Sequence, residues 1–193
     1  MPYNIVRIVA ICLLLLSCSN GSKHCDEIKR LYYQEIYFPK GYVEIKCKSS
    51  FFMDSMLNNN IKIITYVDDI ICTSCLANEL NIWQNEIKKI DTEVPYIIVV
   101  CSGTDNDFVA FADSLSITYP IMCYKTDVFG ICNNLSDILD RNKTFLLNED
   151  NRVILVGEPF GRKKLSKLYK RCIDSVRTCI RVKKYESSCQ CLR

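Results

Sequence analysis

A short apolar segment that leads into a longer amphipathic one constrains the fold of this chain most strongly. Residues 61–67 are rich in β-branched side chains and predict a buried strand, which ends at Asp68-Asp69. Apolar side chains then recur at spacings of four and three from Leu76 to Ile90, the pattern of an amphipathic helix. Trp83 belongs to this stripe and is expected to be a core residue. A buried strand followed directly by such a helix predicts an α/β layer fold.

The rest of the chain continues this alternation of strands and helices. The predicted elements are a strand at 96–101, a helix at 105–115 capped by Asp105, a short strand at 119–124, a short helix at 136–139, a hairpin of 144–147 with 152–156, and a last helix at 165–180. This order predicts a central mixed sheet flanked by helices.

The amino terminus predicts export. Arg7 precedes an apolar run over residues 8–16, which is too short to span a bilayer and is typical of a signal peptide core. The run ends in Leu15-Leu16-Ser17-Cys18, which resembles a bacterial lipobox. By that resemblance Cys18 receives a lipid, becomes the new amino terminus and anchors the protein to a membrane. A plain secretory signal with an incidental cysteine is the alternative.

The chain divides into five predicted parts at these boundaries. They are a signal peptide at 1–17, a lipidated tether at 18–24, an amino-terminal extension with short strands at 25–60, one main domain at 61–180, and a basic, cysteine-containing tail at 181–193. The run Asn58-Asn59-Asn60 marks the break before the main domain.

Charge is distributed unevenly along the sequence. The net charge is +3, yet residues 161–193 hold eleven Lys or Arg residues against only Asp174 and Glu186. The solvated face of an amphipathic helix is the simpler explanation, and contact with an anionic membrane or an acidic partner is the alternative. We expect no nucleic-acid partner.

Cysteine is abundant, with 13 residues in the chain. Once Cys12 is removed and Cys18 is acylated, an odd number remains, so the cysteines cannot all pair within the chain. Several lie where core residues are expected, and a buried free cysteine packs as a small apolar side chain. The clearest cases are Cys101, Cys123, Cys172 and Cys179.

The candidate reactive group is the pair Cys72 and Cys75 in Cys72-Thr73-Ser74-Cys75, between the first strand and its helix. At the first turn of a helix, free N–H groups and the positive end of the dipole stabilise a thiolate and lower the pKa of the thiol. Cys72 is then the exposed attacking thiolate, and Cys75 is the resolving thiol that releases a mixed disulfide. No cofactor is expected.

The sequence resembles the thioredoxin superfamily, and within it the membrane-anchored TlpA/ResA-type thiol–disulfide oxidoreductases of bacteria. The resemblance implies a thioredoxin-like α/β fold, Cys72 as nucleophile and Cys75 as resolving partner. It also implies disulfide exchange with envelope proteins, an upstream redox partner and a periplasm-facing position. The matching stretches are residues 63–67, 72–75, 119–121, 144–148 and 153–157.

Three positions depart from the family pattern. Ile71 stands where the family usually has a tryptophan before the first cysteine. Arg141-Asn142-Lys143 stands where a cis-proline usually precedes the Thr-Phe-Leu strand. Tyr66 stands where thioredoxins bury a carboxylate on the first strand. The cysteine pair is kept while the groups around it differ.

Two other functions remain open. The first is a redox-inactive thioredoxin-like module that binds a partner and holds a structural disulfide. The second, less favoured, is a zinc site in which Cys189 and Cys191 complete a set with the first pair. His24, the only histidine, lies in the predicted tether, which leaves a histidine-based catalytic group without a plausible base.

Overall fold

The structure, a computed structural model, describes residues 23–45, 52–68, 73–101 and 117–190. A helix covers residues 23–31. The further elements are β1 (Val43–Ile45), α2 (Met53–Leu57), β2 (Ile61–Val67), α3 (Thr73–Ile90), β3 (Tyr96–Cys101), β4 (Ile121–Tyr124), α5 (Val128–Cys132), the 3-10 helix η1 (Asp140–Asn142), β5 (Thr144–Asn148), β6 (Val153–Val156) and α6 (Lys163–Gln190).

The strands form one mixed sheet, as the sequence predicts. Their order is β1-β4-β3-β2-β5-β6, with β2, β3 and β4 parallel to one another and β1, β5 and β6 antiparallel to their neighbours. In the centre, Thr65 of β2 lies opposite Thr144 of β5. This register places the end of β2 beside the start of β5.

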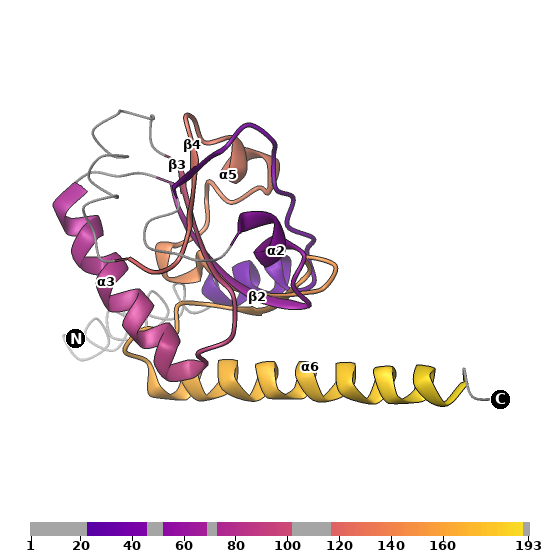
Figure 1. Cartoon of the computed structure of the whole chain (residues 1–193). Helices are drawn as coiled ribbons and strands as arrows, with labels where there is room; N and C mark the ends of the chain where they lie inside the picture. The colour runs from indigo at the N-terminus through magenta and orange to yellow at the C-terminus, as the bar shows by residue number, and fades with distance from the viewer. Residues whose placement is uncertain (1–22, 46–51, 69–72, 102–116, 191–193) are drawn as a thin grey trace, which may run out of the picture.

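Both faces of the sheet are covered, which gives three layers (Figure 1). Alternate residues of β2 point to opposite faces, so Ile63 packs on the side of α3 and α6, and Ile64 packs on the side of α2 and α5. Both isoleucines are completely buried. Burial of such a side chain stabilises the fold by about 1.5–3 kcal/mol.

Most predicted elements are confirmed, and the differences are local. The helix predicted at 105–115 lies outside the described residues. The helix predicted at 136–139 is wrong, because Ile138 donates to the carbonyl of Leu135 in a turn. The helix α5 was not predicted, since it is short and contains Gly130; Asp127 caps it by accepting a 2.9 Å hydrogen bond from the Gly130 amide.

The amino-terminal extension shares the sheet and core of the main domain. Its helix begins at residue 23, within the stretch predicted as a tether. Leu31 and Ile36 are buried in the core on the α2 and α5 side. Strand β1 pairs with β4, so it forms one edge of the main sheet.

The carboxy-terminal helix is longer than predicted. It continues to Gln190, so residues 181–190 of the predicted tail are helical. In Figure 1 this end of α6 projects beyond the body of the protein. Among the described residues, no helix has both the length and the apolar character needed to cross a membrane.

Candidate functional site

The cysteine motif lies where β2 gives way to α3. Helix α3 begins at Thr73, directly after Cys72, and its first turn includes Cys75. Cys72 itself and the side chain of Cys75 lie outside the described part of the structure. Their assignment as reactive thiols therefore stays a prediction, and the described residues define their surroundings.

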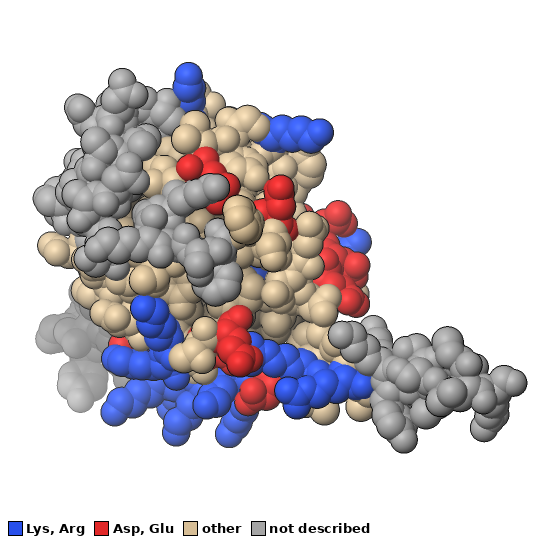
Figure 2. Space-filling model, in the orientation of Figure 1, with Lys and Arg blue, Asp and Glu red and all other residues tan. Residues whose placement is uncertain are grey.

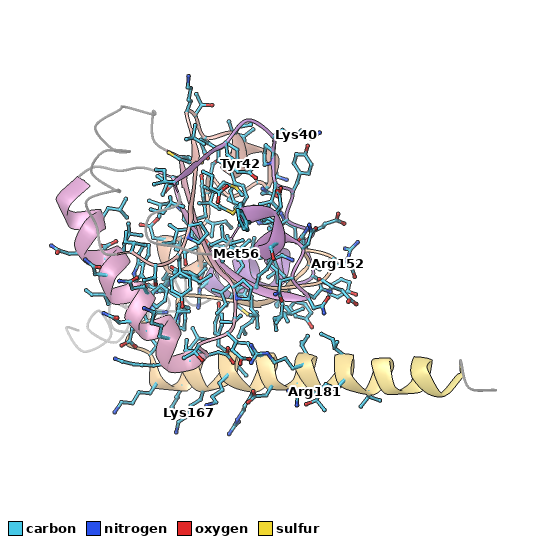
Figure 3. All side chains as sticks on the ribbon, viewed as in Figure 1. Lys40, Tyr42, Met56, Arg152, Lys167 and Arg181 are labelled. Atoms are coloured by element: carbon cyan, nitrogen blue, oxygen red, sulfur yellow. The ribbon has the colours of Figure 1, made fainter. Side chains whose placement is uncertain are left out.

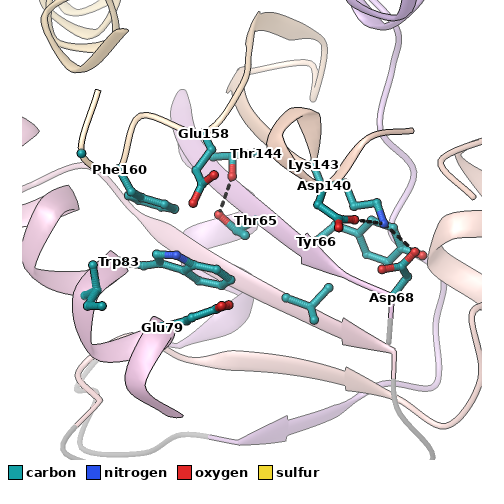
Figure 4. Close-up of a pocket in the computed structure, with 13 residues that line it drawn as sticks. Thr65, Tyr66, Asp68, Glu79, Trp83, Asp140, Lys143, Thr144, Glu158 and Phe160 are labelled. Atoms are coloured by element: carbon teal, nitrogen blue, oxygen red, sulfur yellow. Dashed lines mark hydrogen bonds and ion pairs between the residues drawn. The ribbon is translucent and has the colours of Figure 1, made fainter. Parts of the chain in front are cut away.

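A cavity of about 740 Å³ borders this helix (Figure 4). Its α3 wall contains Glu79, Ile82 and Trp83. Positions 75, 79 and 82 are spaced by four and three residues, so they share one face of α3. The cavity thus borders the helix face on which the second cysteine of the motif is placed. The other lining residues are Thr65, Tyr66, Val67, Asp68, Asp140, Lys143, Thr144, Glu158, Phe160 and Gly161.

Lys143 lies directly before β5, in the stretch 141–143 where the superfamily that the sequence resembles usually has a cis-proline. Its side chain is only 6% exposed, and its ammonium lies 2.5 Å from Asp68 and 2.9 Å from Asp140. The same ammonium lies over the ring of Tyr66, 5.6 Å from the centroid. Burial disfavours the charged amine, but the hydrogen bonds to Asp68 and Asp140 outweigh burial and raise the pKa of Lys143.

The backbone at Lys143 is also fixed on both sides. Its amide donates to the carbonyl of Asp140, and its carbonyl accepts from the amide of Tyr66. A proline here would lack that amide donor. No cis peptide bond occurs in the part of the chain that the structure describes. A buried ion-paired lysine thus takes the place of the proline at this edge of the cavity.

Buried hydroxyl groups form the floor of the cavity. The hydroxyls of Thr65 and Thr144 lie 3.1 Å apart across the β2–β5 pair. The hydroxyl of Tyr96 donates to Thr65 at 3.0 Å. The floor is therefore polar but internally hydrogen-bonded, which stabilises the strand pair.

An aromatic pair and two carboxylates form the opposite part of the wall. Trp83 of α3 stacks on Phe160 of the β6–α6 loop, with centroids 5.5 Å apart. Glu79 and Glu158 flank this stack in Figure 4. Burial, with further contributions from Glu79 and Asp140, raises the pKa of Glu158. Trp83, expected from the sequence to be core, is instead partly buried and lines the cavity.

Tyr66, which stands where the resembling thioredoxins bury a carboxylate, points to the face of the sheet opposite α3. Its hydroxyl donates to Asp127, and burial together with this hydrogen bond raises the pKa of Tyr66. Burial, followed by the charge of Asp127, raises the pKa of the Cys101 thiol to about 12. Cys101 is therefore a neutral, packed thiol, as its place in an apolar strand predicts.

His24 also reaches this region, although the sequence placed it in a tether. Its Nδ1 lies 3.0 Å from the side-chain nitrogen of Asn142, which is completely buried and adjoins Lys143. The same nitrogen donates to Glu27 at 2.8 Å. The helix at residues 23–31 therefore supports the segment that positions Lys143.

The zinc alternative depends on Cys189 and Cys191. Cys189 belongs to the last turns of α6, and Cys191 lies outside the described residues. In Figure 1 the carboxy-terminal end of α6 and the start of α3 lie at opposite sides of the molecule. This arrangement disfavours a shared site that includes Cys75.

No family model matches the sequence, and no curated protein matches it. Among solved structures, the chain is similar to a proposed protein disulfide isomerase from Bacteroides thetaiotaomicron, with a TM-score of 0.51 and 14% identity over 76% of this chain and 91% of the other. A proposed electron transfer protein from Aquifex aeolicus gives a TM-score of 0.48 and 10% identity over 72% and 96% of the two chains. A proposed DsbE thiol:disulfide interchange protein from Chlorobium tepidum gives 0.46 and 10% over 70% and 94%. The first match, together with the mixed sheet and its flanking helices, shows that the chain has a thioredoxin-like fold.

Proposed function

We propose that this thioredoxin-fold chain is an exported thiol–disulfide oxidoreductase that is lipid-anchored at Cys18 and exchanges disulfides with proteins of the cell envelope. The observation that carries the proposal is the start of α3 at Thr73, directly after Cys72. At that position the free amides of a helix's first turn stabilise a thiolate. The cavity beside α3 offers room for a segment of a substrate protein.

The proposed reaction moves two electrons in two steps. The Cys72 thiolate attacks one sulfur of a substrate disulfide, forms a mixed disulfide and releases the other substrate sulfur as a thiolate. The Cys75 thiolate then attacks the sulfur of Cys72 and releases the second substrate thiolate. The substrate ends as a dithiol and the protein as a Cys72–Cys75 disulfide, which an upstream dithiol partner reduces again. The reverse sequence oxidises a substrate dithiol.

A second candidate is a partner-binding module in which the cysteines form a structural disulfide. Lys143 favours this candidate, since its ion pairs fill the place of the family's proline. With Asp68, Asp140 and Lys143, the edge of the cavity carries charged groups where a proline would be uncharged. The cysteine pair is still present in the sequence. The two functions differ in whether Cys72 reacts with other proteins.

Trapping of mixed disulfides separates the two functions. In Cys75→Ser the resolving thiol is lost, so Cys72 should remain bonded to envelope proteins and give reducible adducts on a non-reducing gel. The matched Cys72→Ser protein keeps Cys75 and should give none. If Cys75→Ser traps no protein and Cys72 is alkylated no faster than the exposed Cys179, the oxidoreductase proposal is wrong and the binding module remains.

A further inference from the structure

Helix α6 has one face in the core and one face of cations in solvent. Tyr169 and Ile173 are completely buried on the inner face. The outer face carries exposed basic side chains over several turns, and Figure 2 shows a row of Lys and Arg along this side of the molecule. These residues, here called the basic face, are Lys163, Lys164, Lys167, Lys170, Arg171 and Arg181.

The basic face carries more positive charge than its described neighbours balance. Arg177 of the same helix turns toward the body and pairs with Asp91 at 2.5 Å. By contrast, no residue of the basic face makes an ion pair within the part of the chain that the structure describes. Asp174 is the one acidic residue exposed between them. The charge of this face is thus available to a partner outside the chain.

The shape of the basic face suits an extended surface. The helix has 28 residues and is about 42 Å long. In Figure 3, Lys167 and Arg181 point away from the body on the same side of this helix. Four of the six cations are lysines, whose ammonium groups act as hydrated point charges rather than as planar two-pronged donors. Lysines along one side of a straight helix can contact several phosphate groups of a flat lipid surface at the same time.

We propose that the basic face lies on an anionic phospholipid surface and sets the orientation of the protein on the membrane. Each cation held near an anionic leaflet strengthens binding about fivefold. A lipid at Cys18 would keep residue 23 within about 18 Å of the membrane surface, because the five peptide units between residues 18 and 23 span at most that length. The docking itself does not depend on the thiol chemistry.

Amine labelling of the full chain in lipid vesicles tests the proposal. The vesicles contain phosphatidylcholine alone or an equal mixture of phosphatidylcholine and phosphatidylglycerol. On the anionic vesicles, labelling of Lys163, Lys167 and Lys170 by a water-soluble reagent should slow several-fold, as read by mass spectrometry. The exposed Lys40 and Lys125 should label equally on both vesicles. Salt at about 1 M, where the Debye length is about 3 Å, should remove the protection.

Two matched variants with the same net charge complete the test. The protection of a lysine is its labelling rate on neutral vesicles divided by its rate on anionic ones. In Lys163→Gln/Lys167→Gln, the protection of Lys170 should fall by up to about 25-fold. In Lys40→Gln/Lys125→Gln, the protection of Lys170 should be unchanged. Equal labelling on neutral and anionic vesicles, or protection that persists in high salt, would overturn the proposal. A chain that sediments with neutral vesicles but gains no protection on anionic ones keeps its anchor and still contradicts docking through α6.

Discussion

The ammonium of Lys143 lies 2.5 Å from the carboxylate of Asp68, where the end of β2 lies beside the start of β5. Asp68 is the last described residue before the segment that contains Cys72. A proline at position 143 would provide no charge for this pair. The lysine therefore pairs with the negative charge at the strand end, four residues before the proposed nucleophile in the sequence.

Removal of that cation should make Cys72 less reactive. In Lys143→Gln the charges of Asp68 and Asp140 lose their partner, and uncompensated negative charge disfavours a nearby thiolate. We expect the pKa of the Cys72 thiol to rise and its alkylation at pH 7 to slow several-fold, as measured from the pH dependence of the alkylation rate. Asp68→Asn should shift this pKa in the opposite direction. Lys125→Gln, at an exposed lysine, is the control. An equal shift of the Cys72 pKa in this control would show that the ion pair of Lys143 and Asp68 does not affect Cys72.

The pair of Asp91 and Arg177 should hold α6 to the end of α3. The guanidinium donates to both carboxylate oxygens, at 2.5 and 2.9 Å. Burial favours the neutral acid, but the bonds from Arg177 and from the amides of Glu93 and Val94 outweigh burial and lower the pKa of Asp91. Asp91→Asn should reduce the free energy of unfolding by about 2 kcal/mol at pH 7. The exposed Asp174→Asn should reduce it by less than about 0.5 kcal/mol.

The pH dependence of this effect follows from the lowered pKa. An acid whose pKa is lower in the folded state stabilises the fold above its unfolded pKa of about 3.9. That stabilisation is lost as the pH falls from there through the folded pKa. The difference between Asp91→Asn and the natural protein in urea unfolding should therefore shrink below about pH 4. A difference that stays constant to lower pH would contradict the account.

The stack of Trp83 on Phe160 should matter for protein substrates. Trp83→Ala removes part of the cavity wall, so exchange with envelope proteins should slow. Exchange with a small disulfide such as oxidised glutathione, which needs less of the wall, should change little. Loss of the stack should also cost about 2 kcal/mol of stability. Ile131→Ala, at an exposed apolar position of α5 that does not line the cavity, is the control and should leave both exchange rates unchanged. Equal slowing with both disulfides in Trp83→Ala would locate substrate binding elsewhere.

The sequence predicted the central fold because its apolar pattern is strong there. The β-branched run of β2 and the stripe from Leu76 to Ile90 each match a single period, and both elements occur where predicted. The short helix α5 has no such stripe, and its stability depends on the capping side chain of Asp127. The pairing of β1 with β4 joins residues distant in sequence, which no local pattern encodes.

The site was predicted less completely, because its charged residues look like surface residues in sequence. Lys143 follows Arg141 and Asn142 in a polar stretch, yet its side chain is buried between two carboxylates and the ring of Tyr66. The register that sets Thr144 opposite Thr65 would have placed Lys143 beside the end of β2. The register cannot be read from the sequence pattern, because it depends on which strands pair. Trp83 was likewise predicted as core because a helical stripe does not distinguish a core from a cavity wall.

The lipid anchor should depend on Cys18 alone among the cysteines. The natural protein should fractionate with membranes and carry lipid at its new amino terminus, detected by mass spectrometry of the amino-terminal peptide. Cys18→Ser should be neither lipidated nor processed at that place. Cys25→Ser, at a nearby exposed cysteine, should behave like the natural protein. A Cys18→Ser protein that is cleaved at the same bond and remains membrane-bound would rule out the anchor.

The reduction potential of the Cys72–Cys75 pair shows whether the two cysteines form an exchangeable disulfide. The protein is equilibrated in glutathione or dithiothreitol buffers of known potential, the thiols are trapped by alkylation, and the two cysteines are followed by mass spectrometry. We expect them to form one disulfide that titrates as a two-electron couple, at a potential between about −120 and −270 mV. A disulfide that stays oxidised below about −300 mV, as structural disulfides do, would contradict it. So would a pair that forms no disulfide under any of these conditions.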